Sequence, residues 1–399
     1  MNKAKIVIGS NYGDEGKGLV THFFANEANQ NGDKCLNVLF NGGCQRGHTV
    51  ELKSTAIHHV FHHFGAGTLD NADTYFDDAF IVNPMVFIRE LRQLQSYPFN
   101  VSDVHCYISP LCRVSTIYDM ILNQLVEKSR GDNKHGSCGL GIFETRKRYN
   151  SVEFSKCYKD LASMSAYDLA EYLRSIREIW LKEQVERNNI AKIPTDLLNV
   201  ISSDNVITNW ISDFIEMTKY CEVADFNQLV MQYDTVIFEG AQGLALDEFN
   251  IGDAPYLTPS RTTSQVPMEI IKNTGIDCDV EICYVTRSYF TRHGRGPLPT
   301  QCSIDQINPE IIDSTNIANE WQGHLRYGKF DKHDFIARVM YDQIQSRAIL
   351  PANMSLFVTQ VNYTDGDICG DTSITELRQH FDKCYVSASR FADDIEEVK

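Results

Sequence analysis

The segment Gly13-Asp14-Glu15-Gly16-Lys17-Gly18 directly follows the apolar run Ile6-Val7-Ile8. A strand that ends in a glycine-rich loop with a lysine is typical of phosphate binding, because backbone N–H groups and a positive charge reach the phosphate oxygens together. The loop differs from the common nucleoside-triphosphate loop G-x-x-x-x-G-K-[ST], since Asn11 stands at its first glycine and Gly18 follows the lysine. Acidic residues inside an anion-binding loop are useful if one of them holds a metal ion or removes a proton. The segment therefore predicts phosphate chemistry with a base or a metal ligand built in.

A second glycine-rich block follows the mostly apolar run Leu36 to Leu39. It reads Phe40-Asn41-Gly42-Gly43-Cys44-Gln45-Arg46-Gly47-His48-Thr49. We interpret the pair as a strand and a turn that ends in a histidine. Histidine titrates near neutral pH and is the most common general acid or base in enzymes. A structural role for His48 is the alternative, but an acid-bearing phosphate loop in the same chain favours catalysis.

Three more apolar runs are followed at once by polar residues. These runs are Thr235 to Phe238, Glu281 to Val285 and Ser355 to Val358. Strands that are buried on both faces appear as short continuous apolar runs, and ligands of open α/β sheets bind beyond the carboxyl ends of such strands. We therefore expect an α/β fold with a large, mostly parallel central sheet, helices on both faces and one shared ligand crevice.

Four blocks of the chain resemble motifs of the adenylosuccinate synthetase family. The family loop G-D-E-G-K-G-K reads GDEGKGL here, and the family block G-G-x-N-A-G-H-T reads GGCQRGHT. The motif F-E-G-A-Q-G is intact from Phe238 to Gly243, and T-R-x-G-x-G-P-x-P-T is intact from Thr291 to Thr300. The resemblance extends from Lys5 to about Arg390, and four blocks in the same order are far more specific than one glycine loop.

The resemblance implies a carbon–nitrogen ligase that joins L-aspartate to C6 of a purine nucleoside monophosphate and uses a nucleoside triphosphate. Removal of the proton on purine N1 places negative charge on O6, which attacks the γ-phosphate. The aspartate amine then displaces phosphate from C6. A lysine and Mg²⁺ would neutralise the charge on the transferring phosphoryl group, which is most of what this chemistry asks of a protein.

The resemblance also implies a role for each matching residue. The implied catalytic residues are Asp14 as the base at N1, His48 as the acid at the phosphoryl group, Lys17, and Gln242 at the 6-oxygen. The implied metal ligands are Asp14 and the carbonyl of Gly47. The triphosphate would be bound by Gly13, Glu15, Gly16, Gly18, Gly47, Thr49, Thr359, Gln360 and Asn362. The purine monophosphate would be bound by Gln45, Ser137, Cys138, Arg146, Arg148, Gln242 and Thr258. L-Aspartate would be held by Gly323 and Arg326.

The donor-binding motif departs from the family pattern. The family sequence T-K-L-D, which reads guanine, is Thr359-Gln360-Val361-Asn362 here. An aspartate accepts two hydrogen bonds from guanine, whereas an asparagine offers one acceptor and two donors, which suits adenine better. A site built for one pattern of donors and acceptors rejects the other because buried polar groups are left unpaired. We therefore expect ATP or dATP as the phosphoryl donor in preference to GTP.

Other departures concern the acceptor and the amino acid. The family's aspartate loop G-A-T-T-G-R-R-R-R-T-G-W is shortened to residues 321–328, where Arg326 alone keeps an obvious counterpart. Gln45 and Arg46 replace an asparagine and an alanine. These changes resemble the bacteriophage branch of the family, whose enzymes make the diaminopurine nucleotide precursor from dGMP, aspartate and ATP. The presence of Asp14 argues against membership of that branch, because many of its members carry a small residue at this position.

We favour the dGMP reaction, and three alternatives stay open. The first is the ordinary enzyme of AMP biosynthesis, which uses IMP, aspartate and GTP. The second is a nucleotide-binding regulator, which would bind tightly without aspartate-dependent phosphate release and has no need of Asp14, His48 and Gln242 together. The third is a related ligase that joins another amine to another 6-oxopurine.

Family members complete the monophosphate site with an arginine from the neighbouring subunit, so the resemblance predicts a homodimer. The family's phosphate-touching turn matches Ser137-Cys138-Gly139, and an arginine follows at a shortened spacing. Either Arg146 or Arg148 could be that residue.

Composition narrows the setting of the protein. We expect one domain over residues 1–399 with a mainly helical insertion around residues 151–228, because no linker-like segment interrupts the chain. The absence of a signal peptide and of an apolar run near about twenty residues predicts a cytoplasmic protein, in the host cytoplasm if it is viral, with no membrane partner. The net charge of −16 argues against nucleic-acid binding and requires the cations of an anionic site to gather locally. Twelve cysteines without a C-x-x-C pair predict free thiols, many of them buried.

Overall fold

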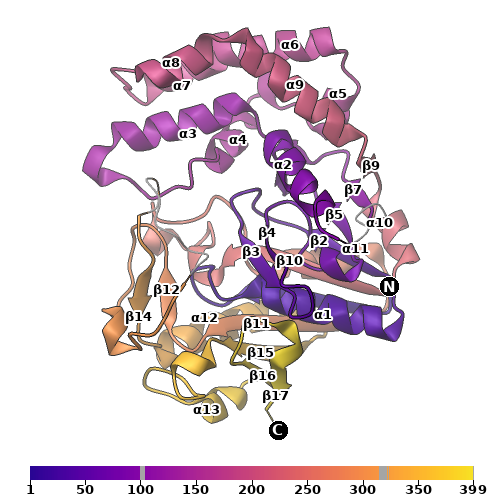
Figure 1. Ribbon diagram of the computed structural model, residues 1–399, viewed down its shortest axis with the longest axis vertical. Helices are drawn as coiled ribbons and strands as arrows, with labels where there is room; N and C mark the ends of the chain where they lie inside the picture. Colours follow the sequence, from indigo (N-terminus) through magenta and orange to yellow (C-terminus); the bar gives the residue numbers. More distant parts are fainter. Residues whose placement is uncertain (99–103, 314–320, 322, 399) are drawn as a thin grey trace.

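The computed structural model describes residues 1–98, 104–313, 321 and 323–398, and its centre is one large sheet (Figure 1). Among these residues ten strands form the sheet, and every neighbouring pair is parallel except the pair at one edge, β16 and β17. The strands in spatial order are β17 (Ile395–Glu397), β16 (Lys383–Ser387), β15 (Asn353–Thr359), β11 (Asp279–Arg287), β1 (Lys3–Gly9), β10 (Thr235–Gly243), β2 (Cys35–Leu39), β5 (Asp73–Phe76), β7 (Cys106–Ile108) and β9 (Cys221–Val223). The predicted α/β fold with a mostly parallel sheet is confirmed.

The five strands predicted from apolar runs lie side by side at the middle of this sheet, in the order β15, β11, β1, β10 and β2. Because the strands are parallel, their carboxyl ends meet at the same edge. The loops that follow them are therefore brought together, although β1 ends at Gly9 and β15 ends at Thr359, 350 positions later in the chain.

Helices and small sheets surround the central sheet. The helices are α1 (Lys17–Asn31), α2 (Pro84–Gln95), α3 (Ile117–Ser129), α4 (Ile142–Arg148), α5 (Tyr158–Ala162), α6 (Ala166–Ser175), α7 (Lys182–Arg187), α8 (Thr195–Ser202), α9 (Asp204–Thr218), α10 (Phe226–Leu229), α11 (Gln265–Thr274), α12 (Lys332–Arg347) and α13 (Ile374–Arg378). The small sheets pair β3 (His48–Glu51) with β4 (His58–Phe61), β6 (Ile81–Val82) with β8 (Arg113–Val114), and β14 (Arg326–Gly328) with both β12 (Phe290–Arg292) and β13 (Gln301–Cys302). None of the described helices is both long enough and apolar enough to cross a membrane.

Alternation along β1 explains why helices cover both faces of the sheet. Successive side chains of a strand point to opposite faces. Val7 packs in a cluster with Val20 and Phe24 of α1. Ile6 and Ile8 belong to another cluster, which contains residues of α11 and α12. A continuous apolar run therefore gives a strand that is buried on both sides, as the sequence predicted.

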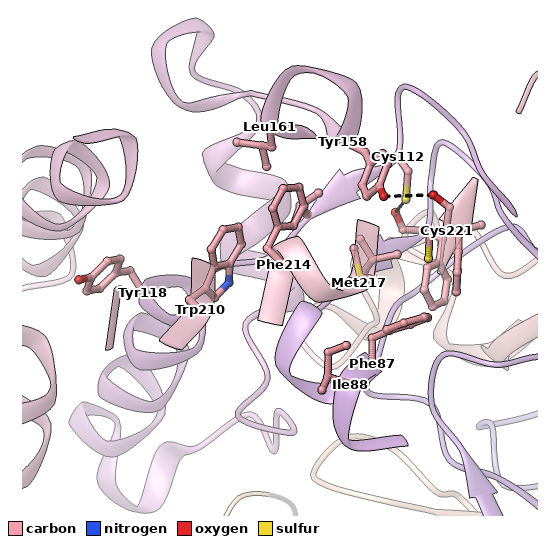
Figure 2. Close-up of a cluster of buried hydrophobic side chains, with 14 of the residues drawn as sticks. Phe87, Ile88, Cys112, Tyr118, Tyr158, Leu161, Trp210, Phe214, Met217 and Cys221 are labelled. Atoms are coloured by element: carbon pink, nitrogen blue, oxygen red, sulfur yellow. Dashed lines mark hydrogen bonds between the residues drawn. The ribbon is translucent and has the colours of Figure 1, made fainter. Parts of the chain in front are cut away.

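Residues 151–228 fold mainly as helices, of which α5 to α9 form the layer at the top of Figure 1, while α10 and the edge strand β9 lie lower, at the right. In the predicted helical stretch 165–187, α6 and α7 are joined by a π-helical segment, Ile176–Leu181. Figure 2 shows how this layer is anchored: Trp210 stacks on Phe214 with ring centroids 5.2 Å apart, and Met217 points toward α2. Burial of each large apolar side chain contributes about 1.5–3 kcal/mol, so this cluster fixes the helices to the edge of the sheet.

All twelve cysteines lie within the described part of the chain, and none of them forms a disulfide. Eight of these thiols are buried. The expectation of free and largely buried thiols is confirmed.

Candidate active site

A cavity of about 1150 Å³ lies beyond the carboxyl ends of β1, β2 and β10. Ten of the residues predicted from the sequence line it: Gly13, Asp14, Gln45, Gly47, His48, Ser137, Cys138, Arg146, Gln242 and Thr258. The cavity is also lined by five further cations, Arg46, Arg130, Lys147, Arg292 and Arg295. The protein as a whole is acidic, so this gathering of positive side chains suits an anionic ligand.

Two glycines of the loop after β1 are required by the geometry of its backbone. Gly16 has φ of +97° and begins α1, and a side chain at this left-handed position would be strained. A Cβ at Gly18 would lie 2.9 Å from the carbonyl carbon of His48. The phosphate loop and the histidine block therefore touch backbone to backbone, and Gly18 contributes by its small size.

Glu15 braces the loop from inside. Its carboxylate accepts hydrogen bonds from the N–H groups of Asn11, at 3.0 Å, and Gly13, at 2.9 Å. Burial raises the pKa of Glu15, although Lys17, 3.6 Å away, partly offsets this effect. Glu15 therefore supports the loop through Oε1, whereas Oε2 is buried with no hydrogen-bond partner among the described residues, and its predicted contact with the triphosphate stays a prediction.

Lys17 and Asp14 leave the same loop in different directions. The Lys17 ammonium is buried and donates to the carbonyl of Gly13 at 2.6 Å, so its charge lies just behind the cavity wall. The Asp14 carboxylate faces the cavity, 3.8 Å from Nε2 of His293. The Asp14 carbonyl accepts a hydrogen bond from Nε of Arg287 at 2.5 Å, which ties the loop to the end of β11.

His48 lies at the cavity end of a buried network of charged side chains, in which Glu239 stands between His48 and Arg46. Its Nδ1 lies 2.5 Å from Oε1 of Glu239, and the other carboxylate oxygen lies 3.4 Å from the guanidinium of Arg46. Burial lowers the pKa of His48 to about 4, and the hydrogen bond to Glu239 opposes this shift only in part. Burial would raise the pKa of Glu239, but Arg46 and His48 together lower it, so the carboxylate stays ionised. The neutral imidazole donates from Nδ1 and leaves Nε2 for a ligand in the cavity.

Sequence reasoning missed the roles of Glu239 and Arg46. Glu239 is the acid of the F-E-G-A-Q-G motif and lies in the middle of β10, directly after the apolar run Thr235 to Phe238, a position that could have marked it as the partner of a catalytic histidine. Arg46 was seen only as a departure from the family pattern. The structure buries it, with its Nε donating to the carbonyl of His62 at 3.0 Å.

A hydrogen-bond chain supports the predicted monophosphate turn. The hydroxyl of Ser137 donates to Asn123 at 3.0 Å, and the amide of Asn123 donates to Glu144 at 3.1 Å. The second oxygen of Glu144 is buried and has no hydrogen-bond partner among the described residues, and Glu144 lines the cavity. Burial raises the pKa of Glu144 to about 7. No sequence motif marks this acid, because its partners come from α3 and the following turn.

We expect Glu144→Gln to stabilise the protein at about pH 8 and to change little at about pH 4. The folded-state pKa of Glu144 lies near 7 and the ordinary value is 4.5, so stability is lost as the pH rises between these two values. A difference of one pKa unit corresponds to about 1.4 kcal/mol, so the gain in unfolding free energy is on the order of 1–3 kcal/mol. Urea denaturation at both pH values measures it. An equal gain at both would show that the carboxyl proton is not the cause.

The two arginines predicted to bind the monophosphate, Arg146 and Arg148, lie in different environments. Arg146 lines the cavity and donates to Glu248 at 2.7 Å and to the carbonyl of Pro259. Arg148 points away from the cavity into the protein. It is 1% exposed and bonds to Asp119 at 2.9 Å and to the carbonyl of Phe154 at 2.6 Å. The prediction that Arg148 can bind the monophosphate is wrong, because its guanidinium is buried and fully used by the fold.

The predicted donor-binding turn lies next to the phosphate loop. The hydroxyl of Thr359 donates to the carbonyl of Glu15 at 2.8 Å, and a Cβ at Gly16 would lie 3.2 Å from its methyl group. Gln360 has φ of +64° and precedes a short 3₁₀ turn in which Asn362 is exposed. Thr49 lies on β3, directly after His48. Thr359 therefore contacts the loop between Gly13 and Gly18, and the same loop lines the cavity with Gly13 and Asp14.

The predicted aspartate-binding residues lie on the small sheet beside the cavity. Arg326 donates to Oε1 of Gln301 at 2.9 Å and to the carbonyl of Gly296 at 2.9 Å, and it pairs with Arg292 across β12 and β14. Burial and the neighbouring charge of Arg292 lower the pKa of Arg326. Gly323 is exposed. Gln322, in the same predicted loop, lies outside the described residues.

Comparison with known proteins gives a consistent result. The sequence profile described as "Adenylosuccinate synthetase" matches residues 6–332. An adenylosuccinate synthetase of Clostridium botulinum (strain Eklund 17B / Type B) is 29% identical over 336 residues, which cover 82% of this chain and 69% of the relative. One from Psychrobacter cryohalolentis is 30% identical over 377 residues, which cover 92% of this chain and 79% of the relative.

Two solved structures share the fold along the whole chain. Fully ligated adenylosuccinate synthetase from Plasmodium falciparum superposes with a TM-score of 0.73 at 16% identity and is covered completely. Succinoaminodeoxyadenylate synthetase of cyanophage S-2L, bound to dGMP and to dATP as an energy donor, gives 0.63 at 13% identity, with 95% of it covered. At these identities the likeness is one of fold.

Proposed function

This chain belongs to the adenylosuccinate synthetase family, and on that premise we propose that it joins L-aspartate to C6 of dGMP with ATP or dATP as phosphoryl donor. Family members are nucleotide-binding carbon–nitrogen ligases of purine biosynthesis, and this chain is such a ligase. The products of the proposed reaction are N6-succino-2-amino-2′-deoxyadenylate, a nucleoside diphosphate and phosphate. The observation that carries the proposal is Asn362, which stands where the family uses an aspartate to read guanine and follows Thr359, the residue that contacts the phosphate loop.

The first step activates the purine. Asp14 takes the proton from N1, and the O6 that becomes anionic attacks the γ-phosphorus of the donor. The ring of His48 lines the cavity, and Glu239 holds it through Nδ1 and stabilises the imidazolium that forms when a phosphoryl oxygen of the donor raises its proton affinity. Lys17 adds a fixed positive charge behind Gly13, which helps to neutralise the transferring group. Gln242 is the side chain available to hold the 6-oxygen.

The second step forms the carbon–nitrogen bond. The amine of aspartate attacks C6 and displaces the phosphate that activation placed on O6. Arg326 and Gly323 are the proposed contacts for the aspartate carboxylates. The proposed contacts for the acceptor nucleotide are Ser137, Cys138, Gln45 and Thr258, and Arg146 is proposed to come from the neighbouring subunit. Together they hold the two reactants at the distance that makes the addition effectively intramolecular.

The donor set suits Mg²⁺ as cofactor. The carboxylate of Asp14 and the carbonyl of Gly47 both line the cavity and are oxygen ligands, which this ion prefers. Mg²⁺ usually takes only one or two protein ligands and completes its shell with water and substrate phosphates. When bound, it would supply charge neutralisation between the phosphates of the donor.

Two observations favour the ordinary reaction with IMP and GTP as the second candidate. Asp14 is retained, and the bacterial relatives described above are named adenylosuccinate synthetases. A phosphate-release screen separates the candidates by crossing IMP, dIMP, GMP and dGMP with ATP, dATP and GTP, each with and without aspartate. Highest activity with dGMP and an adenine donor supports the proposal, and highest activity with IMP and GTP supports the ordinary enzyme.

We expect ATP or dATP to exceed GTP by at least about tenfold in kcat/KM. The amide of Asn362 can donate to adenine N1 and accept from the 6-amino group, but it cannot accept both guanine donors. One unmatched buried hydrogen bond costs about 1–3 kcal/mol, or roughly tenfold to a hundredfold. Asn362→Asp should narrow or reverse the preference, and Gln360 in place of lysine should keep the reversal partial. Steady-state rates with the three donors measure this, and a clear preference of the unmodified protein for GTP would refute the donor switch.

We propose that the enzyme is a homodimer in which Arg146 completes the acceptor site of the neighbouring subunit. Arg146→Ala is then expected to lower kcat/KM for the monophosphate by about tenfold or more, since a charge-assisted contact is worth about 1.5–3 kcal/mol. Mixing this variant with Asp14→Asn should restore activity, because one of the two sites in each mixed dimer is intact. Arg187→Ala, which removes an exposed arginine, is the matched control. A monomer by sedimentation at full activity contradicts the proposal.

A further inference from the structure

His293 is a cavity residue for which the reaction as described has no use. It occupies a variable position of the T-R-x-G-x-G-P motif, where the resemblance implies no role. Its ring lines the cavity, and its Nε2 lies 3.8 Å from Oδ2 of Asp14. Both side chains are mostly buried, with 16% of His293 and 24% of Asp14 exposed.

The chain on either side of His293 is held firmly. The guanidinium of Arg292 donates to the carbonyl of Pro297 at 2.7 Å and to that of Tyr256 at 2.8 Å. Gly294 has φ of +66°, and a Cβ there would lie 3.3 Å from the carbonyl oxygen of Gly136. These contacts fix the backbone on both sides of His293, and the ring, with 16% of its side chain exposed, has little free space in which to turn.

The Asp14 carboxylate is held less firmly than the backbone that carries it. Arg287 fixes the Asp14 carbonyl. The ion pair with His293 is the only one that this carboxylate makes with a described residue. An aspartate has two side-chain torsions, so a fixed carbonyl alone leaves several orientations of the carboxylate open.

We propose that His293 is a positioning residue, which holds the Asp14 carboxylate in the orientation at which it removes the proton from purine N1. The inference rests on the proposed role of Asp14 as the base. At 3.8 Å the two side chains are not hydrogen-bonded to each other, and a small rotation of either one brings an Nε2–H donor within hydrogen-bond distance of Oδ2. Misplacement of a reacting group by about 1 Å can cost about a hundredfold in rate, so a firmly held partner has a large effect without touching the substrate.

The segment that carries His293 also reaches the other end of the acceptor site. Gly294 packs against Gly136, and Gly136 directly precedes the monophosphate residues Ser137 and Cys138. The same short stretch of chain thus contacts the base-handling loop and the phosphate turn. His293 therefore holds Asp14 in register with the place where the phosphate end of the nucleotide is gripped.

A double-mutant cycle tests the proposal. The variants are His293→Leu, His293→Gln, Asp14→Asn and Asp14→Asn with His293→Leu, assayed in single turnover with saturating dGMP or IMP, ATP and aspartate. We expect His293→Leu to lower the rate constant about tenfold to a hundredfold, while KM for the monophosphate changes less than about threefold. His293→Gln, which keeps a donor, should recover most of the loss. In the Asp14→Asn background, His293→Leu should have no further effect, because the residue that it positions is gone.

Each other outcome has a definite meaning. An equal loss from His293→Leu in both backgrounds, a loss confined to KM, or an equal loss in His293→Gln overturns the positioning role. A near-normal rate of Asp14→Asn alone overturns the proposed function instead, and so the two failures are distinguishable. His333→Leu, at an exposed histidine on α12, controls for the removal of an imidazole. Thermal unfolding of each variant separates loss of the fold from loss of rate, and if His293→Leu unfolds, His293→Gln alone decides through its rate.

Discussion

Replacing Asp14 with asparagine is expected to lower the rate of turnover by about 10²–10⁴-fold, the usual cost of losing a general base. Asparagine has the same shape but cannot accept the N1 proton. The Asp14 carboxylate faces the cavity and makes no contact on which the fold depends, so folding and nucleotide binding should stay close to those of the unmodified protein. Aspartate-dependent phosphate release measures the rate, and calorimetric titration with the nucleotides measures binding.

Asp196→Asn is a suitable control, because it makes the same chemical change at an exposed site in the first turn of α8. A rate of Asp14→Asn near that of the unmodified protein would show that Asp14 is not the base. The purine would then have to reach the reactive state by another route, such as binding in a form that is already ionised.

Replacing His48 with alanine is expected to have an effect of the same size on turnover, about 10²–10⁴-fold, because it removes the group that donates to the transferring phosphoryl. The effect on stability should be small by comparison. Glu239 would keep its contact with Arg46 and the hydrogen bond that it accepts from the N–H of Ala66 at 3.0 Å. Phosphate-release kinetics and thermal unfolding on the same samples test both parts.

Glu239→Gln provides the contrast. It keeps the side-chain shape but removes the negative charge that lies between His48 and Arg46. Breaking a buried ion pair by removing one partner typically costs about 3–5 kcal/mol, so this variant should lose stability as well as rate. If His48→Ala loses stability to the same extent as Glu239→Gln, then the histidine is part of the structural core of the site and not mainly a catalytic group.

The strands and the location of the site were predictable from the sequence. Runs such as Ile6-Val7-Ile8 are apolar at every position, and this pattern arises because the strands are buried on both faces. Loops at the carboxyl ends of adjacent parallel strands must converge, so Asp14, His48 and Gln242 could be placed in one crevice before any coordinates were known. The family is established by the profile that spans residues 6–332.

The directions of individual side chains were not predictable in the same way. Arg148 is buried because Asp119, 29 residues earlier, and the carbonyl of Phe154 satisfy its guanidinium. Glu15 turns inward because the backbone N–H groups of its own loop offer it partners. Both outcomes depend on three-dimensional neighbours, which a motif does not record. Nucleotide specificity likewise depends on a few hydrogen bonds at the ends of the site, and a motif does not record them.

The backbone contact between Gly18 and His48 has an evolutionary consequence. Where two backbones are in van der Waals contact, neither loop can shift gradually. A substitution in one loop is then tolerated only with a compensating change in the other. The turn that ends in Asn362 is at the protein surface and free of such a constraint. On the proposed function, changes in this turn alter the choice of donor nucleotide, whereas the phosphate loop and the histidine block stay as they are. An enzyme lineage can in this way change its phosphoryl donor to suit the nucleotides available in the cell, without changing its catalytic residues.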